Sequence, residues 1–198
     1  MPRTYSEKER QVIISELRRA AMESMIQKGI KKTTIDELVE KIRIPKGTFY
    51  LFYKSKELLL FDAIMQKEEE LHEKMGQKFL SIVENLSVDS LTNLLFDFYQ
   101  MGFELGILPL MLNGELDILI RKLPDDIVAD SISRDDDFIV IFLKLFPHMD
   151  REKLQLYSAA FRAIFFTAAY KREIGDDYES VLKLLIQGIV LQIWEENQ

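Results

Sequence analysis

The chain has 198 residues, no cysteine and a formal net charge of −7 at pH 7. Without cysteine it can form neither disulfides nor thiolate metal sites, and it has no cysteine nucleophile. Its N-terminus lacks the apolar stretch of a signal peptide, and no apolar run reaches the ~18 residues of a transmembrane helix, so we expect a cytoplasmic protein that needs no membrane.

The N-terminal region is predicted to begin with two helices that have defined starts. Ser6 and Glu9 fit a capping box, and apolar residues at helical spacing continue towards Gly29, which suits a left-handed helix end. Thr34 and Glu37 fit a second capping box, which opens a short helix that reaches about residue 42.

A third short helix and a long fourth helix follow. Pro45 suits the first turn of the third helix, and Ser55 is predicted to start the long one, which reaches about residue 83. Phe49 and Phe52 are expected to face inward, and Lys46, Thr48 and Tyr50 to face outward. Two short helices joined by a tight turn, with a basic outer face on the second, indicate a helix-turn-helix.

The rest of the chain is predicted to be helical too, which makes the protein all-α. Helices are expected at residues 88–107, before a break at Pro109, and at about 114–123, 150–172 and 177–196. Asp150 is predicted to cap the third of these, and Asp176 and Glu179 fit a capping box for the last. A further segment begins at Pro124 and has an apolar end at residues 137–146.

Positive charge is concentrated near the N-terminus. Residues 1–60 contain 13 Lys and Arg against 8 Asp and Glu, a net charge of +5, whereas the remainder carries −12. This asymmetry favours an anion-binding N-terminal part on an acidic body, although chance clustering on a solvated surface would give the same count. Lysines neutralise phosphates and tyrosine hydroxyls donate to them, so residues 43–59 are the candidate nucleic-acid interface.

The stretch GIKKTTIDELVEKIRIPKGTFYLFYKSKELL, residues 29–59, resembles the DNA-binding head of the TetR family of bacterial transcriptional regulators. The likeness covers roughly residues 10–60. It implies a homodimer that binds a palindromic double-stranded DNA operator through recognition helices in successive major grooves. It also implies an all-helical C-terminal domain that binds a small-molecule inducer, and repression as the common mode of action.

Eight residues are predicted to contact DNA, most of them on the recognition helix or at its end. They are Thr34, Lys46, Gly47, Thr48, Tyr50, Tyr53, Lys54 and Lys56. Among them Gly47 would let the backbone approach the duplex closely.

The helix that includes residues 91–107 carries polar side chains at steps of four, three and four. These are Asn93, Asp97, Gln100 and Glu104, and the aromatic residues beside them include Phe96, Tyr99 and Phe103. The stripe is either the solvent edge of the helix or the lining of a buried cavity. In a cavity, two carboxylates beside aromatic rings would suit a cationic or amphipathic ligand.

The last two predicted helices carry more apolar surface than a monomer would leave exposed. Candidates for a two-fold interface are Leu154, Tyr157, Phe161, Phe165, Leu184, Ile189 and Trp194. A pair of such helices from each subunit would form a four-helix interface. The alternative is that these residues close the core of the monomer.

These predictions divide the chain into a three-helix DNA-binding domain, residues 1–54, and a helical ligand-binding and dimerisation domain, residues 55–198. The two are joined through the long helix. The predicted function is that of a DNA-binding transcriptional repressor released from its operator by a small-molecule inducer. The alternatives are a helical interaction module and a small helical enzyme with an acidic pocket. No phosphate loop, dinucleotide fingerprint or hydrolase motif is present, so we expect no catalytic residue, metal or cofactor.

Overall fold

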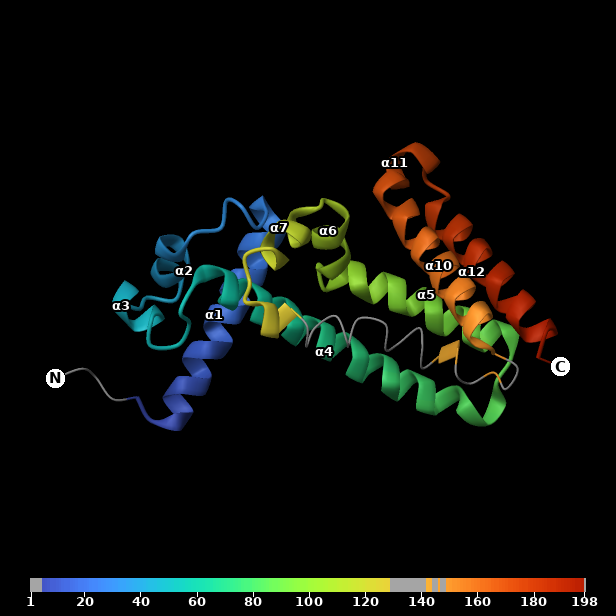
Figure 1. Cartoon of the computed structure of the whole chain (residues 1–198), viewed down its shortest axis with the longest axis horizontal. Coiled ribbons are helices and arrows are strands. Elements are labelled where there is room, and N and C mark those ends of the chain that lie inside the picture. Colours follow the sequence, from blue (N-terminus) through green and yellow to red (C-terminus); the bar gives the residue numbers. More distant parts are fainter. Residues whose placement is uncertain (1–4, 129–141, 144–145, 147–148, 198) are drawn as a thin grey trace. The chain divides into compact units, whose positions relative to one another are not determined.

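The computed structural model describes residues 5–128, 142–143, 146 and 149–197, and every regular element within them is a helix (Figure 1). This confirms the all-α prediction. The chain forms two compact units. The first comprises Met1–Glu69 and Leu105–Pro124, and the second comprises Glu70–Glu104 and Asp125–Gln198. The predicted functional division at residues 54 and 55 stays a prediction.

The first unit contains the predicted head together with two short helices from later in the chain. Its elements are α1 (Glu7–Lys28), α2 (Ile35–Lys41), α3 (Lys46–Phe49), the first part of α4 (Lys56–Ile82), α6 (Ile107–Leu112) and α7 (Glu115–Ile120). The capping box at Ser6 is confirmed, because its hydroxyl accepts from the Glu9 N–H and the Glu9 carboxylate accepts from the Ser6 N–H. Gly29 ends α1 with a positive φ of 88°, as predicted.

One apolar core holds this unit together. Leu17, Leu38, Phe49 and Leu59 are fully buried in it, and Leu119 of α7 is 1% exposed in the same cluster. Phe49 therefore joins α3 to this core, which confirms its predicted inward orientation. Burial of such side chains is the main favourable contribution to folding of a small helical unit.

The predicted break at Pro109 lies a few residues too late. Helix α5 (Val88–Glu104) ends before Gly106, whose φ of 78° is left-handed and disfavoured for residues with a side chain. Pro109 then lies in the first turn of α6, where its missing N–H leaves no hydrogen bond unmade. Glycine, not proline, thus ends the predicted helix.

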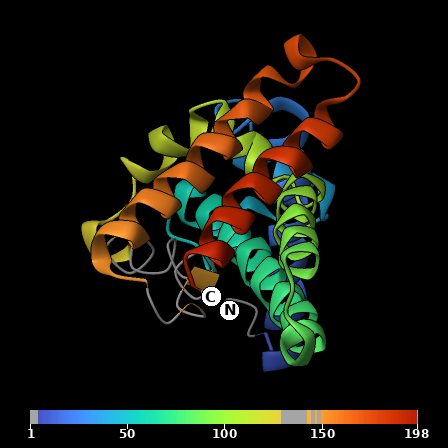
Figure 2. The ribbon, with the colours of Figure 1, turned by 90° about the vertical axis from the view of Figure 1, so that its right-hand side faces the viewer.

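The second unit consists of the end of α4 and of helices from the last part of the chain. Its other elements are η1 (Val83–Asn85), α5 (Val88–Glu104), α10 (Arg151–Phe166), η2 (Thr167–Tyr170), α11 (Lys171–Ile174) and α12 (Tyr178–Glu195). Helix α12 packs against both α5 and α10, and α10 lies beside it in both views (Figures 1 and 2). Most of the apolar segment 137–146 lies outside the described residues.

Helix starts in this unit agree with the sequence in one case and differ in another. Asp150 caps α10 by accepting a 2.8 Å hydrogen bond from the Lys153 N–H, as predicted. The capping box predicted from Asp176 is wrong, because the N-cap is Asp177 and its side chain makes no capping bond. No helix among the described residues is long and apolar enough to cross a bilayer.

Candidate nucleic-acid interface

The two short helices of the head are joined by a tight turn. Helix α2 ends at Lys41, and Arg43 takes a positive φ of 58° before the chain enters α3. The turn is closed by a 3.0 Å hydrogen bond from the Ile44 N–H to the Val39 carbonyl. Pro45 stands as the N-cap of α3, with φ −61°. This arrangement is the helix-turn-helix that the sequence predicted.

Four of the eight predicted DNA contacts lie exposed on α3 or just beyond it: Lys46, Gly47, Tyr50 and Lys54. Lys46 forms a 2.7 Å ion pair with Asp36, and this hydrogen bond raises the pKa of Lys46. Tyr50 is 51% exposed, and a Cβ added at Gly47 would meet nothing within 4 Å. These residues are therefore free to approach a duplex, and their contact with DNA stays a prediction.

Thr48 does not face outward as predicted, because it is only 8% exposed. Tyr5, which precedes α1, lies over it, with 3.3 Å between the Tyr5 hydroxyl and Thr48 Oγ1. The Tyr5 ring also contacts Phe52, and the Arg10 guanidinium lies 4.9 Å from the centre of that ring. No local sequence pattern indicated this cluster, since Tyr5 and Thr48 are 43 residues apart.

Tyr53 differs from its predicted role as a hydroxyl donor to phosphate. Its hydroxyl donates a 2.5 Å hydrogen bond to Asp62, which also receives two bonds from Arg18, of 2.7 and 2.8 Å. Burial and the bond to Asp62 raise the pKa of Tyr53. The cluster joins α1, α4 and the segment between α3 and α4, so Tyr53 helps to hold the recognition helix in place from within the head.

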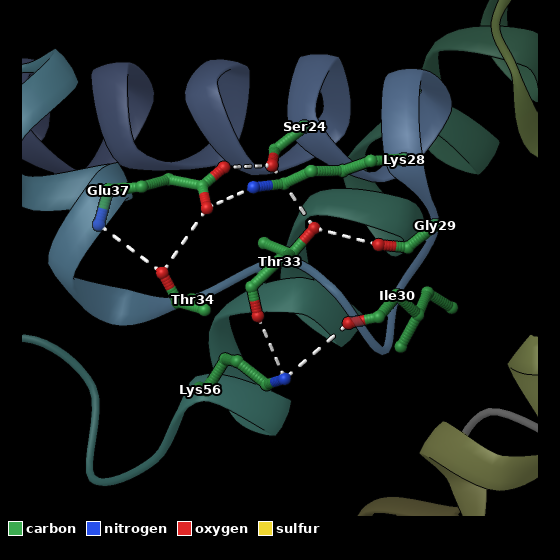
Figure 3. A network of polar contacts seen from close by, with 8 residues as sticks. All are labelled: Ser24, Lys28, Gly29, Ile30, Thr33, Thr34, Glu37 and Lys56. Atoms are coloured by element: carbon green, nitrogen blue, oxygen red, sulfur yellow. Dashed lines mark hydrogen bonds and ion pairs between the residues drawn. The ribbon is translucent and has the colours of Figure 1, made fainter.

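Lys56 is likewise held inside the head. Its Nζ donates to the Thr33 carbonyl at 2.9 Å and to the Ile30 carbonyl at 3.4 Å, as Figure 3 shows. Thr33 is fully buried, and its hydroxyl donates to the Gly29 carbonyl at 2.9 Å. The ammonium of Lys56 is thus bound by the turn between α1 and α2. A DNA phosphate would have to share this ammonium with the two carbonyls.

The start of α2 is fixed by a second polar network (Figure 3). The Thr34 hydroxyl accepts from the Glu37 N–H at 3.4 Å, which is half of the predicted capping box. The other half of the predicted box, a bond from the Thr34 N–H to the Glu37 carboxylate, is wrong. That carboxylate instead accepts from the hydroxyls of Thr34 and Ser24 and pairs with Lys28. Although burial opposes the shift, the bonds from Lys28, Ser24 and Thr34 lower the pKa of Glu37 to about 2.

This shift predicts an acid-dependent stability. The folded-state pKa of Glu37 lies below the ordinary value of about 4.3. Its contribution is therefore fully present above pH 4.3 and is lost as the pH falls towards about 2. We expect Glu37→Gln to melt below the wild type near neutral pH, and the difference in melting temperature to narrow as the pH falls from about 4.3 towards about 2. Thermal melts across this range test it, with exposed Glu40→Gln as control; a constant gap would contradict it.

The predicted ligand-binding stripe lies on α5, at the surface of the second unit. Asn93 and Glu104 are exposed, Gln100 is half-buried, and Asp97 forms a 2.5 Å ion pair with Lys78. This placement agrees with the solvent-edge alternative and leaves the ligand role of the stripe a prediction.

The aromatic neighbours of the stripe are placed deeper in the second unit. Phe96 and Phe103 are half-buried. Tyr99 is 3% exposed and donates a 2.6 Å hydrogen bond to the Phe161 carbonyl, so it joins α5 to α10. Burial raises the pKa of Tyr99.

The predicted dimer residues divide between core and surface. Tyr157 and Phe161 are 4% and 1% exposed, so their assignment to a surface between subunits is wrong and they close the core of the second unit. Leu184 is 67% exposed. Half-buried positions are those of Leu154, Phe165, Ile189 and Trp194.

Five exposed apolar side chains that the sequence reasoning missed lie on the same two helices and just after α10: Leu156, Phe166, Tyr170, Leu185 and Leu191. Together with Leu184, we call them the α10–α12 apolar surface. On α10 and η2 the members at 156, 166 and 170 continue through exposed Ala159 and Ala163, at steps of three and four. Such spacing places them on one side of the helix, which the sequence alone could have indicated.

A basic helix-turn-helix on an all-helical chain defines a helix-turn-helix DNA-binding protein. Among the described residues no group of three potential ligands could hold a metal ion. Residues 17–63 match the model of the family described as "Bacterial regulatory proteins, tetR family". These residues therefore carry the DNA-binding pattern of the TetR family of bacterial transcriptional regulators, which confirms the resemblance found in the sequence.

Three proteins are similar to this chain over a larger part of its length. The uncharacterized HTH-type transcriptional regulator YhgD of Bacillus subtilis (strain 168) is 29% identical over 147 residues, 64% of this chain and 75% of its own length. A TetR-family structure from Mesorhizobium loti MAFF303099 covers 97% of this chain and 98% of its own, with 15% identity and a TM-score of 0.67. The structure of RolR with resorcinol covers 96% and 95%, with 18% identity and a TM-score of 0.51. Both structures share the fold.

Proposed function

We propose that this protein is a TetR-family repressor that binds a palindromic operator as a homodimer and leaves it when a small molecule binds. The observation that carries the proposal is a helix-turn-helix with exposed Lys46, Tyr50 and Lys54, in a chain whose last helices carry an exposed apolar surface. The first feature suits DNA, and the second suits a second copy of the chain.

Contact with DNA is proposed to begin at α3. Lys46 can exchange its ion pair with Asp36 for a phosphate, because both side chains are exposed and a surface pair contributes little. Tyr50 can donate its hydroxyl to a phosphate or meet a base edge, and Lys54 extends from the segment after α3. Thr34, Thr48, Tyr53 and Lys56 are proposed to act mainly by holding this surface in shape.

Removal of Lys46 or Lys54 is expected to reduce the salt dependence of operator binding. Each phosphate contact that is lost should lower the slope of log K against log salt by about 1, and should weaken binding to all sequences alike. Salt titrations by fluorescence anisotropy would measure this for Lys46→Ala and Lys54→Ala. Lys74→Ala, an exposed lysine of the second unit, serves as control. An unchanged slope in both head variants would contradict the assignment.

The dimer is proposed to form through the α10–α12 apolar surface. Six large apolar side chains exposed on and beside two neighbouring helices exceed what a monomer usually leaves in water. A two-fold contact that places the same surface of each chain together would bury them. Recognition helices of such a dimer would read two half-sites about 34 Å apart.

Release by a small molecule is proposed from family membership and from RolR, whose structure holds resorcinol. The part of the chain outside the helix-turn-helix is proposed to receive the ligand. Helix α4 begins in the first unit and ends in the second, so a ligand that shifts it could alter the head. Thermal shift with phenols, lipophilic cations and fatty acids, followed by operator release with each hit, tests this. A ligand that stabilises the protein without releasing DNA would contradict it.

A further inference from the structure

The segment that contains α6 and α7 is built into the core of the head. Leu110 and Leu119 are 2% and 1% exposed in the cluster that also contains residues of α1, α2 and α3. Gly106, before α6, lies so close to α1 that an added Cβ would be 2.4 Å from Ile26 Cδ1. Residues beyond the helix-turn-helix motif at 17–63 therefore complete the DNA-binding unit.

Within this segment, Glu115 reaches the turn between α1 and α2. Its carboxylate accepts a hydrogen bond from the Ile30 N–H, although the two residues are 85 positions apart. A Cβ at Gly29 would lie 2.6 Å from Glu115 Oε2, so a larger residue there would displace the carboxylate. The Glu115 N–H in turn donates to Asn113 Oδ1 at 3.0 Å, which fixes the start of α7.

The same turn is held from another side by Lys56. While Glu115 accepts from the Ile30 N–H, Lys56 Nζ donates to the carbonyls of Ile30 and Thr33. Ile30 is 5% exposed, so its backbone groups have little access to water as alternative partners. The Glu115 carboxylate and the Lys56 ammonium therefore both bind the turn directly before Thr34, and Thr34 caps α2.

We infer that Glu115 is a positioning residue for DNA binding: it sets the turn at residues 29–33 and so the orientation of α2 and of α3, which packs against it. The inference rests on the proposed function for its operator readout. A carboxylate acceptor makes a stronger bond than a neutral one. Glutamine at this position keeps an acceptor without the charge, and alanine leaves the Ile30 N–H unpaired.

The test compares Glu115→Ala, Glu115→Gln and the control Asp117→Ala, an exposed acidic residue of the same helix. Operator DNA is selected from a random duplex library with the wild type, and affinity is measured well below the melting temperature. We expect Glu115→Ala to weaken binding about tenfold, Glu115→Gln to lie between it and wild type, and the control to match wild type.

A second readout does not depend on DNA. Amide hydrogen exchange of Ile30 in the free protein should speed up in Glu115→Ala and less in Glu115→Gln, while amides of α12 keep their wild-type rates. Wild-type affinity in Glu115→Ala, or unchanged Ile30 exchange, would overturn the inference. Failure of the wild type to select any DNA would overturn the proposed function, and the exchange result would still decide whether Glu115 holds the turn.

Discussion

Leu184→Glu is expected to make the protein monomeric and to reduce operator affinity by about a hundredfold or more, because two linked half-site contacts become independent. Leu184 is 67% exposed on α12, within the α10–α12 apolar surface. A carboxylate placed there would be buried without a partner in a two-fold contact, whereas in a monomer it would remain in water. The substitution should therefore leave the fold of the monomer unchanged.

Light scattering at micromolar concentration measures the assembly, and circular dichroism checks the fold. Leu80→Glu is the matched control, because Leu80 is an equally exposed leucine, at 71%, on α4 and outside the α10–α12 apolar surface. If Leu184→Glu remains a dimer, or if Leu80→Glu is the variant that separates the subunits, the proposed interface is in the wrong place.

Local sequence signals predicted the fold well where the determining residues are neighbours. The capping box at Ser6 and the cap at Asp150 each need only a side chain and an N–H three residues away, and both are present. The same kind of pattern failed at Asp176, where the chain starts α12 one residue later without a side-chain cap. A capping motif states that a bond is possible, and the backbone approach to the helix decides whether it forms.

The residues of the proposed DNA-binding face were named from the sequence, but the direction of some of their side chains was not. Helix α3 is only four residues long, too short for helical periodicity to fix which side chains face outward. Tyr5 therefore decides the burial of Thr48, and Asp62 decides the direction of the Tyr53 hydroxyl. Both contacts depend on tertiary packing, which the pattern along the chain does not contain.

Packing also decided which apolar residues of the last helices are buried. Phe161 and Leu184 look equally suited to a core or an interface in the sequence, yet the first is 1% exposed and the second 67%. The difference arises because α12 packs against α5 and α10, which leaves one side of each helix uncovered. Apolar content predicted an interface, which stays a prediction, while the structure was needed to show which apolar residues remain exposed.

Arg18→Ala is expected to destabilise the head by about 2 kcal/mol, because it leaves the Asp62 carboxylate half-buried without its cation. Arg18 and Asp62 are 30% and 32% exposed and joined by two bonds, so water replaces the guanidinium only in part. The raised pKa of Arg18, caused first by its hydrogen bond to Asp62, reflects the same attraction. Because Tyr53 also binds Asp62, operator affinity should fall together with stability.

Arg19→Ala provides a control from the next residue of α1. Arg19 is 51% exposed and pairs with Glu16 and Glu23 of its own helix, so its loss should destabilise the head much less than the loss of Arg18. Urea unfolding at one protein concentration measures both variants, since stability of a dimer depends on concentration. Addition of Asp62→Asn to Arg18→Ala should recover part of the loss, because it removes the stranded charge. Equal destabilisation by the two arginine variants, or no recovery, would mean that the Arg18, Asp62 and Tyr53 cluster does not hold the recognition helix.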